Sequence, residues 1–171
     1  LHVPTNQLKA GANDLYTQDG QYVCVHLPSK INGNKKGTRL FVVVHGYGAR
    51  KNTSRGRQNV RRLATDWGER VDPYNWVVIA PHFDEKRFKK NYQRLNHSGL
   101  AADTRLNHLT DAIGKGLSPQ NPKKRILLFG FSGGGQFVHR YLAFHGHRVL
   151  RAVVGAPGWY MWPNPWLPYP L

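Results

Sequence analysis

The chain has 171 residues, of which 40% are hydrophobic and 12% aromatic, and this composition suits one folded domain and excludes a disordered protein. Its clean apolar runs, such as Leu40 to Val44, are far too short to span a bilayer, and the single cysteine, Cys24, excludes an internal disulfide. Lys and Arg number 25 against 9 Asp and Glu, a net charge of 25 − 9 = +16. This charge favours a polyanionic ligand, a cationic surface that only aids solubility, or a protein whose acidic half is missing from this chain.

The N-terminal residues predict a hairpin and then a solvated loop. Asp19-Gly20 is a favoured hairpin-turn pair, and it joins a weak strand at 15–16 to a stronger one at 21–27. Residues 28–37, with Asn-Gly-Asn and three lysines, are expected to form a loop. The apolar run 40–44 that follows is typical of a strand covered on both faces in a parallel sheet.

Helices and strands are expected to alternate through the rest of the chain. Apolar residues recur at helical spacing over 60–71 and over 102–113, and continuous apolar runs at 76–80 and 126–129 predict strands, as does the segment 150–154. A helix is expected after the strand at 126–129. The polar stretch 82–98 is expected to be a long loop with a basic cluster at Lys86, Arg87, Lys89 and Lys90.

This alternation predicts the α/β class, with a mostly parallel sheet in a three-layer sandwich that has helices on both faces. Residues 1–171 are expected to form one domain, without internal repeats. Residues 159–171 are rich in Pro and Trp and carry no periodicity, so we expect them to form an irregular tail.

The sequence Gly130-Phe131-Ser132-Gly133-Gly134 stands between a predicted strand and a helix-like pattern. This is the arrangement of a nucleophile elbow, in which a serine lies on a sharp turn from strand to helix. The strained turn leaves no room for bulky neighbours, which explains Gly130 and Gly134, and the helix N-terminus offers N–H groups to an oxyanion. We expect Phe131 to be a core residue. The alternative is a glycine-rich turn without chemistry.

A second motif, His45-Gly46-Tyr47-Gly48, follows the first central strand. Together with the Ser132 elbow it resembles the α/β-hydrolases, in the style of esterases, lipases and polyester depolymerases, over about residues 13–160. The resemblance implies Ser132 as the nucleophile and the backbone N–H groups of Tyr47 and Gly133 as the oxyanion hole. It covers only the N-terminal portion of that fold, so the domain is expected to be truncated after the strand that follows the nucleophile helix.

Other residues have weaker claims on the site. His82 follows a strand end and is a candidate substrate contact and base, whereas His45 is expected to support its loop through hydrogen bonds. Trp159 and Tyr160 are candidates to line an apolar or polymeric substrate cleft, or to pack against absent elements. We expect no metal site, because no cluster of His, Cys or Asp has ligand spacing, and no cofactor.

A serine hydroxyl needs a base that is itself oriented by a carboxylate, and in this fold both residues follow the nucleophile. Here Asp111 is the last acidic residue and His147 the last histidine. We therefore expect the acid and the base to come from a missing C-terminal segment or a partner chain, and the 171 residues alone to have little activity.

The sequence thus predicts a serine hydrolase that cleaves small-molecule or polymeric carboxylic esters through an acyl-enzyme on Ser132. The alternative is a non-catalytic basic module that binds a polyanion or a larger assembly, with the cluster at 86–90 as its contact. The first residue is Leu1 rather than Met, which favours a processed protein that is secreted or periplasmic.

Overall fold

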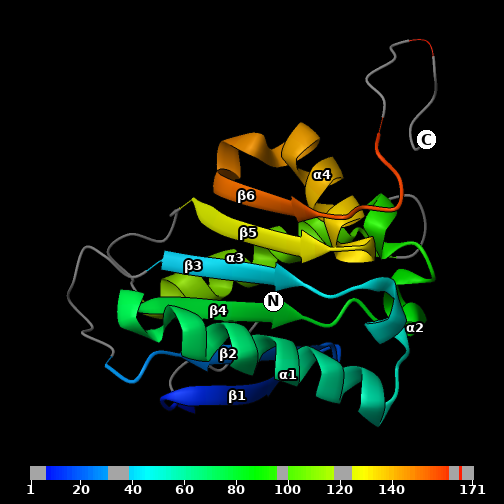
Figure 1. Cartoon of the computed structure of the whole chain (residues 1–171). Coiled ribbons are helices and arrows are strands. Elements are labelled where there is room, and N and C mark those ends of the chain that lie inside the picture. The colour runs from blue at the N-terminus through cyan, green and yellow to red at the C-terminus, as the bar shows by residue number, and fades with distance from the viewer. Residues whose placement is uncertain (1–6, 31–38, 96–99, 118–124, 162–165, 167–171) are drawn as a thin grey trace.

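A computed structural model describes residues 7–30, 39–95, 100–117, 125–161 and 166. They form one six-stranded sheet with helices on both of its faces (Figure 1). The strands are β1 (Gly11–Tyr16), β2 (Tyr22–Leu27), β3 (Arg39–Val44), β4 (Trp76–Pro81), β5 (Ile126–Phe131) and β6 (Val149–Gly155). The α-helices are α1 (Ser54–Val71), α2 (Glu85–Phe88), α3 (Ala102–Leu117) and α4 (Gly133–His145). Single turns of 3₁₀ helix are η2 (Tyr47–Arg50), η3 (Asp72–Tyr74), η4 (Tyr92–Arg94) and η5 (Gly146–Arg148).

The strand order in the sheet is β1-β2-β4-β3-β5-β6. The β1–β2 hairpin pairs antiparallel, with β2 antiparallel to β4, whereas β4, β3, β5 and β6 pair parallel to one another. The arrows of these four strands point to the same edge in Figure 1, so the loops that follow them gather there. The predicted α/β class with a mostly parallel sheet is confirmed, and this edge is where ligands bind in open α/β sheets.

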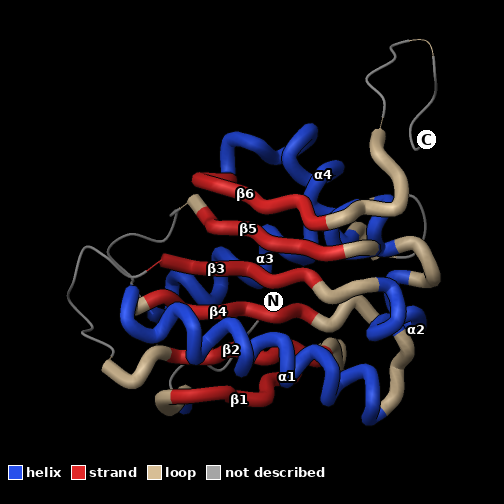
Figure 2. Tube along the Cα trace, viewed as in Figure 1, coloured by secondary structure: helices blue, strands red, loops and turns tan. Residues whose placement is uncertain are grey.

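Each face of the sheet has its own apolar core, as the alternation of side chains along the strands requires. On one face α1 presents Val60, Ala64 and Val71 to side chains that include Val43 and Val78. On the other face α3 and α4 cover the opposite side of the same strands, with a core that contains Leu106, Leu109, Ile113, Phe137, Val138 and Tyr141. The predicted three-layer sandwich is therefore correct, with α1 on the near side in Figure 2.

The stretch predicted to be a long loop after β4 contains two short helical elements, α2 and η4. Asp84 caps α2 with its side chain, which accepts hydrogen bonds from the backbone N–H groups of Lys86 and Arg87. Phe88 and Tyr92 are fully buried in the core beneath α4. These two aromatic side chains anchor a segment whose sequence has no helical periodicity, which is why the sequence did not reveal it.

The α1 side of the sheet is covered only in part. Helix α1 packs on β1, β2 and β4, and within the described residues no helix lies in front of β5 and β6 in Figure 2. Phe131, predicted to be a core residue, is instead 57% exposed there, and Val153 is 59% exposed on the adjacent strand. The core prediction for Phe131 was wrong because its side chain lies at the end of β5, beyond Phe129, whose ring packs against Trp67 of α1 at 4.8 Å between centroids.

Among the helices of the described residues, none combines the length and the apolar composition needed to cross a membrane. Most of the predicted tail, residues 162–165 and 167–171, lies outside the described residues, as does most of the predicted loop 28–37.

Candidate active site

Ser132 lies at the turn between β5 and α4, at the edge where the parallel strands end. Its backbone has φ 56° and ψ −118°, a conformation that a residue with a side chain adopts only at a cost. Two hydrogen bonds hold the turn: the Ser132 N–H donates to the Gly155 carbonyl at 2.9 Å, and the Ser132 carbonyl accepts from the Gln136 N–H at 3.0 Å. Ser132 is thus presented on a strained, well-supported turn, as a nucleophile elbow requires.

The glycines around Ser132 are required by close backbone approach. A Cβ on Gly130 would lie 2.2 Å from the Gly134 carbonyl oxygen, and a Cβ on Gly134 would lie 2.2 Å from the Val44 carbonyl oxygen. Strand β5 and helix α4 therefore pack against each other and against the end of β3 at distances that only glycine allows. This contact brings the elbow next to the loop that carries Tyr47.

Two helices begin beside Ser132. Tyr47 is the first residue of η2 and Gly133 the first residue of α4, so neither N–H has an acceptor within its own helix. A Cβ on Gly133 would lie 2.9 Å from the Tyr47 nitrogen, and a Cβ on Gly46 would lie 3.9 Å from the Ser132 Cβ. The geometry thus places the Tyr47 and Gly133 backbones together at the nucleophile, where two N–H donors can stabilise an oxyanion.

His45 holds the loop that carries Tyr47. Its Nε2 accepts from the Phe83 N–H at 3.0 Å, so its Nδ1–H donates to the Gly46 carbonyl at 2.8 Å, and the imidazole is neutral. Burial lowers the pKa of His45 to about 3. The hydroxyl of Tyr92 donates to the His45 carbonyl at 2.7 Å. His45 is therefore a support of the loop, as its position in the sequence suggested.

His82 lies behind the loop rather than in the site. Its side chain is buried, its Nε2 bonds to the Ala49 carbonyl at 2.8 Å, and its ring contacts that of His45 at 5.7 Å between centroids. Burial is also the main cause that lowers the pKa of His82. The predicted contact of His82 with substrate does not fit this placement, because the imidazole is enclosed and bonded to the backbone at the end of η2.

Arg50 fixes the ring of Tyr47, which is exposed to solvent. The guanidinium lies 3.6 Å from the centre of the ring, and Nη1 donates to the Tyr47 carbonyl at 3.0 Å. Arg50 is also held by Glu85, with 3.7 Å between Nε and Oε2. The ring of Tyr47 is thereby kept at the mouth of the site.

A cavity of about 350 Å³ lies over Ser132, within the size range of small-molecule sites. Two aromatic residues line it, together with Ser132, Gly133 and four long polar side chains, and the full set is Tyr47, Gln93, Arg94, Ser132, Gly133, Gln136, Arg140 and Trp159. The predicted substrate contact Trp159 thus lies at the same cavity as the nucleophile. Tyr160 does not line it, because its ring packs against His139 at 5.2 Å between centroids.

The sequence analysis missed the polar residues of this cavity. Gln136 and Arg140 follow Ser132 at intervals of four residues, a spacing that puts all three on one face of a helix and was readable from the sequence. Gln93 and Arg94 lie in a polar stretch without periodicity, so no local signal marks them. They line the cavity because the side chains of Phe88 and Tyr92, in the same stretch, are buried in the core and hold η4 against α4.

No hydrogen bond joins the Ser132 hydroxyl to a histidine within the described residues. His139 accepts from the Met161 N–H at 3.2 Å, and His145 lies 2.9 Å from Asp103 at the far end of α4. The described part of the chain also contains no group of three His, Cys, Asp or Glu side chains that could hold a metal ion. Ser132 and the backbones of Tyr47 and Gly133 thus lie together, and no histidine bonds to the Ser132 hydroxyl within the described residues.

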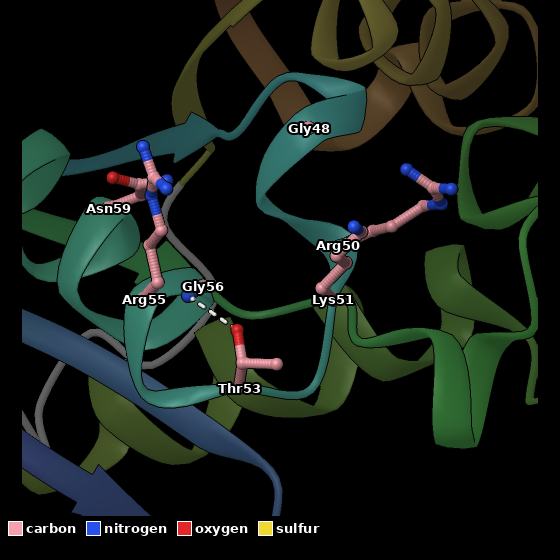
Figure 3. Close-up of a pocket in the computed structure, with 7 residues that line it drawn as sticks. All are labelled: Gly48, Arg50, Lys51, Thr53, Arg55, Gly56 and Asn59. Atoms are coloured by element: carbon pink, nitrogen blue, oxygen red, sulfur yellow. Dashed lines mark hydrogen bonds between the residues drawn. The ribbon is translucent and has the colours of Figure 1, made fainter.

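A second cavity, of about 380 Å³, lies at the N-terminus of α1 and is shown in Figure 3. Gly48, Arg50, Lys51, Thr53, Arg55, Gly56 and Asn59 line it. The guanidinium groups of Arg50 and Arg55 point in different directions in Figure 3, and no residue predicted for the active site belongs to it. We therefore place the candidate active site at Ser132.

Comparison with known proteins gives matches to solved structures only, since no family model and no curated protein matches the sequence. The poly(aspartic acid) hydrolase-1 of Sphingomonas sp. KT-1 is 23% identical with a TM-score of 0.69, and the match covers 95% of this chain and 62% of that one. The poly(3-hydroxybutyrate) depolymerase LpqC of Bordetella parapertussis is 22% identical with a TM-score of 0.70, covering 95% and 57%. The Staphylococcus aureus fluorophosphonate-binding serine hydrolase FphF is 16% identical with a TM-score of 0.60, covering 84% and 55%.

The chain therefore spans less than two thirds of the length of each of these structures. At such identities the likeness concerns the fold. The similarity to esterases and depolymerases that the two sequence motifs indicated is confirmed at this level, since nearly all of the chain superimposes on theirs. This protein has the α/β-hydrolase fold.

Proposed function

We propose that the protein is a serine hydrolase that cleaves carboxylic esters through an acyl-enzyme on Ser132. The observation that carries the proposal is the meeting of a strained Ser132 with the first N–H groups of two helices, at Tyr47 and Gly133. A non-catalytic turn needs neither the strain nor the paired donors, whereas acyl transfer needs both.

The chemistry follows from this geometry. The Ser132 oxygen attacks the carbonyl carbon of the ester, and its proton passes to a base. The carbonyl oxygen becomes an oxyanion, which the N–H groups of Tyr47 and Gly133 stabilise at the moment when the charge develops. The alcohol leaves with a proton, and water then hydrolyses the acyl-enzyme and restores the Ser132 hydroxyl. Each hydrogen-bond donor in such a site contributes a factor of about 100 or more in rate.

The proposal also requires a base and a carboxylate that orients it. The histidines nearest to the elbow in the sequence or in the fold, His45, His82 and His139, are bonded to backbone groups. We propose that the base and acid come from residues beyond the 171 of this chain or from a partner chain. The structural neighbours are longer than this chain, which is consistent with such a contribution.

The substrate is proposed to be an ester, either a small molecule or a polymer. Two of the neighbours are named for hydrolysis of the polymers poly(aspartic acid) and poly(3-hydroxybutyrate). Trp159, 73% exposed at the edge of the cavity, suits contact with an extended apolar segment of substrate.

A non-catalytic basic module is less well supported. Arg87, the arginine of the basic cluster at 86–90, is bonded through Nη1 to Asp84 at 2.8 Å and through Nη2 to the Asp19 carbonyl at 2.6 Å. Its guanidinium therefore ties α2 to the turn of the β1–β2 hairpin instead of facing a polyanion.

The test is labelling with a fluorophosphonate, which phosphonylates an activated serine with loss of fluoride. The natural protein, purified at its full length, is incubated with the reagent, and its intact mass is then measured. We expect one adduct, absent from Ser132→Ala and retained in Ser54→Ala, a matched change of an exposed serine at the start of α1. No adduct on the wild type, or an adduct that persists in Ser132→Ala, contradicts the proposal.

A further inference from the structure

The cavity over Ser132 carries positive charge on side chains that lie close to the nucleophile. Arg94, half-buried on η4, and Arg140, buried on α4, both line it. The guanidinium group of arginine stays protonated throughout the pH range in which proteins are folded. Both arginines therefore bring positive charge to the lining of this cavity at any pH at which an ester would be cleaved.

Among the described residues, no Asp or Glu side chain lines the cavity beside these two arginines. All 9 Asp and Glu residues fall in the described ranges. The carboxylate of Glu85, the first residue of α2, pairs with Arg50. Others pair far from the site, as Asp103 does with His145 and Asp111 with Arg148.

Arg140 also fixes the wall that bears Arg94. Its Nη1 lies 3.4 Å from the Gln93 carbonyl on η4 and 3.3 Å from the Gln136 carbonyl on α4. A single guanidinium thus joins η4 to the helix that begins at the nucleophile. The fully buried ring of Tyr92, the first residue of η4, anchors the same turn.

We propose that the ester substrate of this site carries a carboxylate group, which Arg94 binds while the ester carbonyl lies at Ser132. This inference rests on the proposed function, because it names the substrate class of the same serine. A guanidinium presents parallel N–H donors that match the two oxygens of a carboxylate. The charge of Arg140 adds to the attraction, and Trp159 covers the apolar part of the substrate.

The test is equilibrium binding of two amides that Ser132 does not need to cleave. N-phenylsuccinamic acid and N-phenylbutyramide differ only in that a carboxylate in the first is a methyl group in the second. We expect calorimetry to show the acid binding about 10- to 100-fold more tightly, the range of a hydrogen bond to a charged group. Arg94→Gln should remove this preference and leave the affinity for the butyramide unchanged.

The control is Arg151→Gln, which makes the same change of charge at an exposed position of β6 outside the cavity. It should keep the preference for the acid. Equal binding of the two amides, no binding of the acid, or loss of the preference in Arg151→Gln as large as in Arg94→Gln would each overturn the inference.

These outcomes are separable from those of the proposed function. If the binding preference depends on Arg94 while fluorophosphonate does not label Ser132, that result would support the carboxylate site and contradict the proposed hydrolase activity. Labelling of Ser132 without any preference for the carboxylate would support the proposed hydrolase activity and contradict the carboxylate site.

Discussion

Gly133 lies between the nucleophile and the loop after β3, and the space around its Cα is closed on both sides. A Cβ there would lie 2.9 Å from the Tyr47 nitrogen and 3.0 Å from the Tyr92 hydroxyl. We therefore expect Gly133→Ala to push the two oxyanion donors apart and to slow fluorophosphonate labelling of Ser132 by about 100-fold, as loss of one donor does. The rate constant is measured by following the intact mass with time.

Gly48→Ala is the matched control in the same loop as Tyr47. A Cβ at Gly48 has no atom within 4 Å, and its backbone does not need glycine. The same added methyl group should leave the labelling rate unchanged. If both variants were slowed equally, the effect would come from general loosening of η2 and not from the contact of Gly133 with Tyr47.

Single residues of the candidate site were predictable where a short sequence motif is linked to a specific backbone geometry. Ser132, Tyr47 and Gly133 are implied by two short glycine-containing motifs, and the structure brings them together. Phe131 and His82 were misplaced because their exposure depends on what packs above them, which the local sequence does not contain. Phe131 lies exposed at the end of β5, and His82 lies beneath a loop from another part of the chain.

At the scale of elements, α1 begins with a defined cap. The Thr53 hydroxyl accepts a hydrogen bond from the Gly56 N–H at 3.1 Å, visible in Figure 3. Thr53→Ala leaves one N–H of the first turn unsatisfied, so we expect the free energy of unfolding to fall by about 1 kcal/mol. Urea unfolding followed by circular dichroism measures the difference.

Thr65→Ala makes the identical substitution within the same helix. The Thr65 hydroxyl bonds to the Arg61 carbonyl at 3.1 Å, which adds little to a helix because that carbonyl already has a partner. The free energy of unfolding should change by less than about 0.5 kcal/mol. A loss equal to that of Thr53→Ala would show that the cap has no special role.

The long elements were predictable and the short ones were not. Periodic apolar residues indicated α1 and α3, and continuous apolar runs indicated β3, β4 and β5, because each buries its own side chains in a regular pattern. Helices α2 and η4 have too few residues for a period. They exist because Asp84 caps one and because Phe88 and Tyr92 are buried in a core made by other elements.

At the scale of the whole molecule, stability is expected to fall in mild acid. Burial lowers the pKa of His45 to about 3, and it also lowers the pKa of His82. An unfolded histidine titrates near its ordinary value of 6.5, so between these pH values the unfolded chain binds more protons than the folded one. The free energy of unfolding should therefore decrease as the pH falls from about 6.5 toward about 3, by up to about 1.4 kcal/mol per pH unit for His45.

Urea unfolding at a series of pH values from neutrality to about pH 4 measures this slope. His45→Gln removes the titrating group and should flatten the curve, although it also weakens the loop at neutral pH. A wild-type protein with equal stability over this whole range would contradict the assignment of His45 as a buried neutral imidazole.

The α/β class was predictable from the alternation of strands and helices, but the order of the strands was not. A run of apolar residues indicates that a strand is buried, but it does not indicate which strands pair with it. In this sheet β4 lies between β2 and β3. The incomplete cover of one face was likewise not predictable from single segments. Phe131 and Val153 are ordinary strand residues until the position of α1 is known.

Strands β3 and β5 are paired in the sheet although they lie far apart in the sequence, and this pairing affects the rate of folding. Tyr47 follows β3 and Gly133 follows β5, and the whole of α1, β4 and α3 separates them along the chain. Closing so long a loop is slow compared with forming a helix or a hairpin. We therefore expect refolding protein to regain its helical signal before Ser132 becomes reactive, so the reactivity of one serine would report completion of the central sheet.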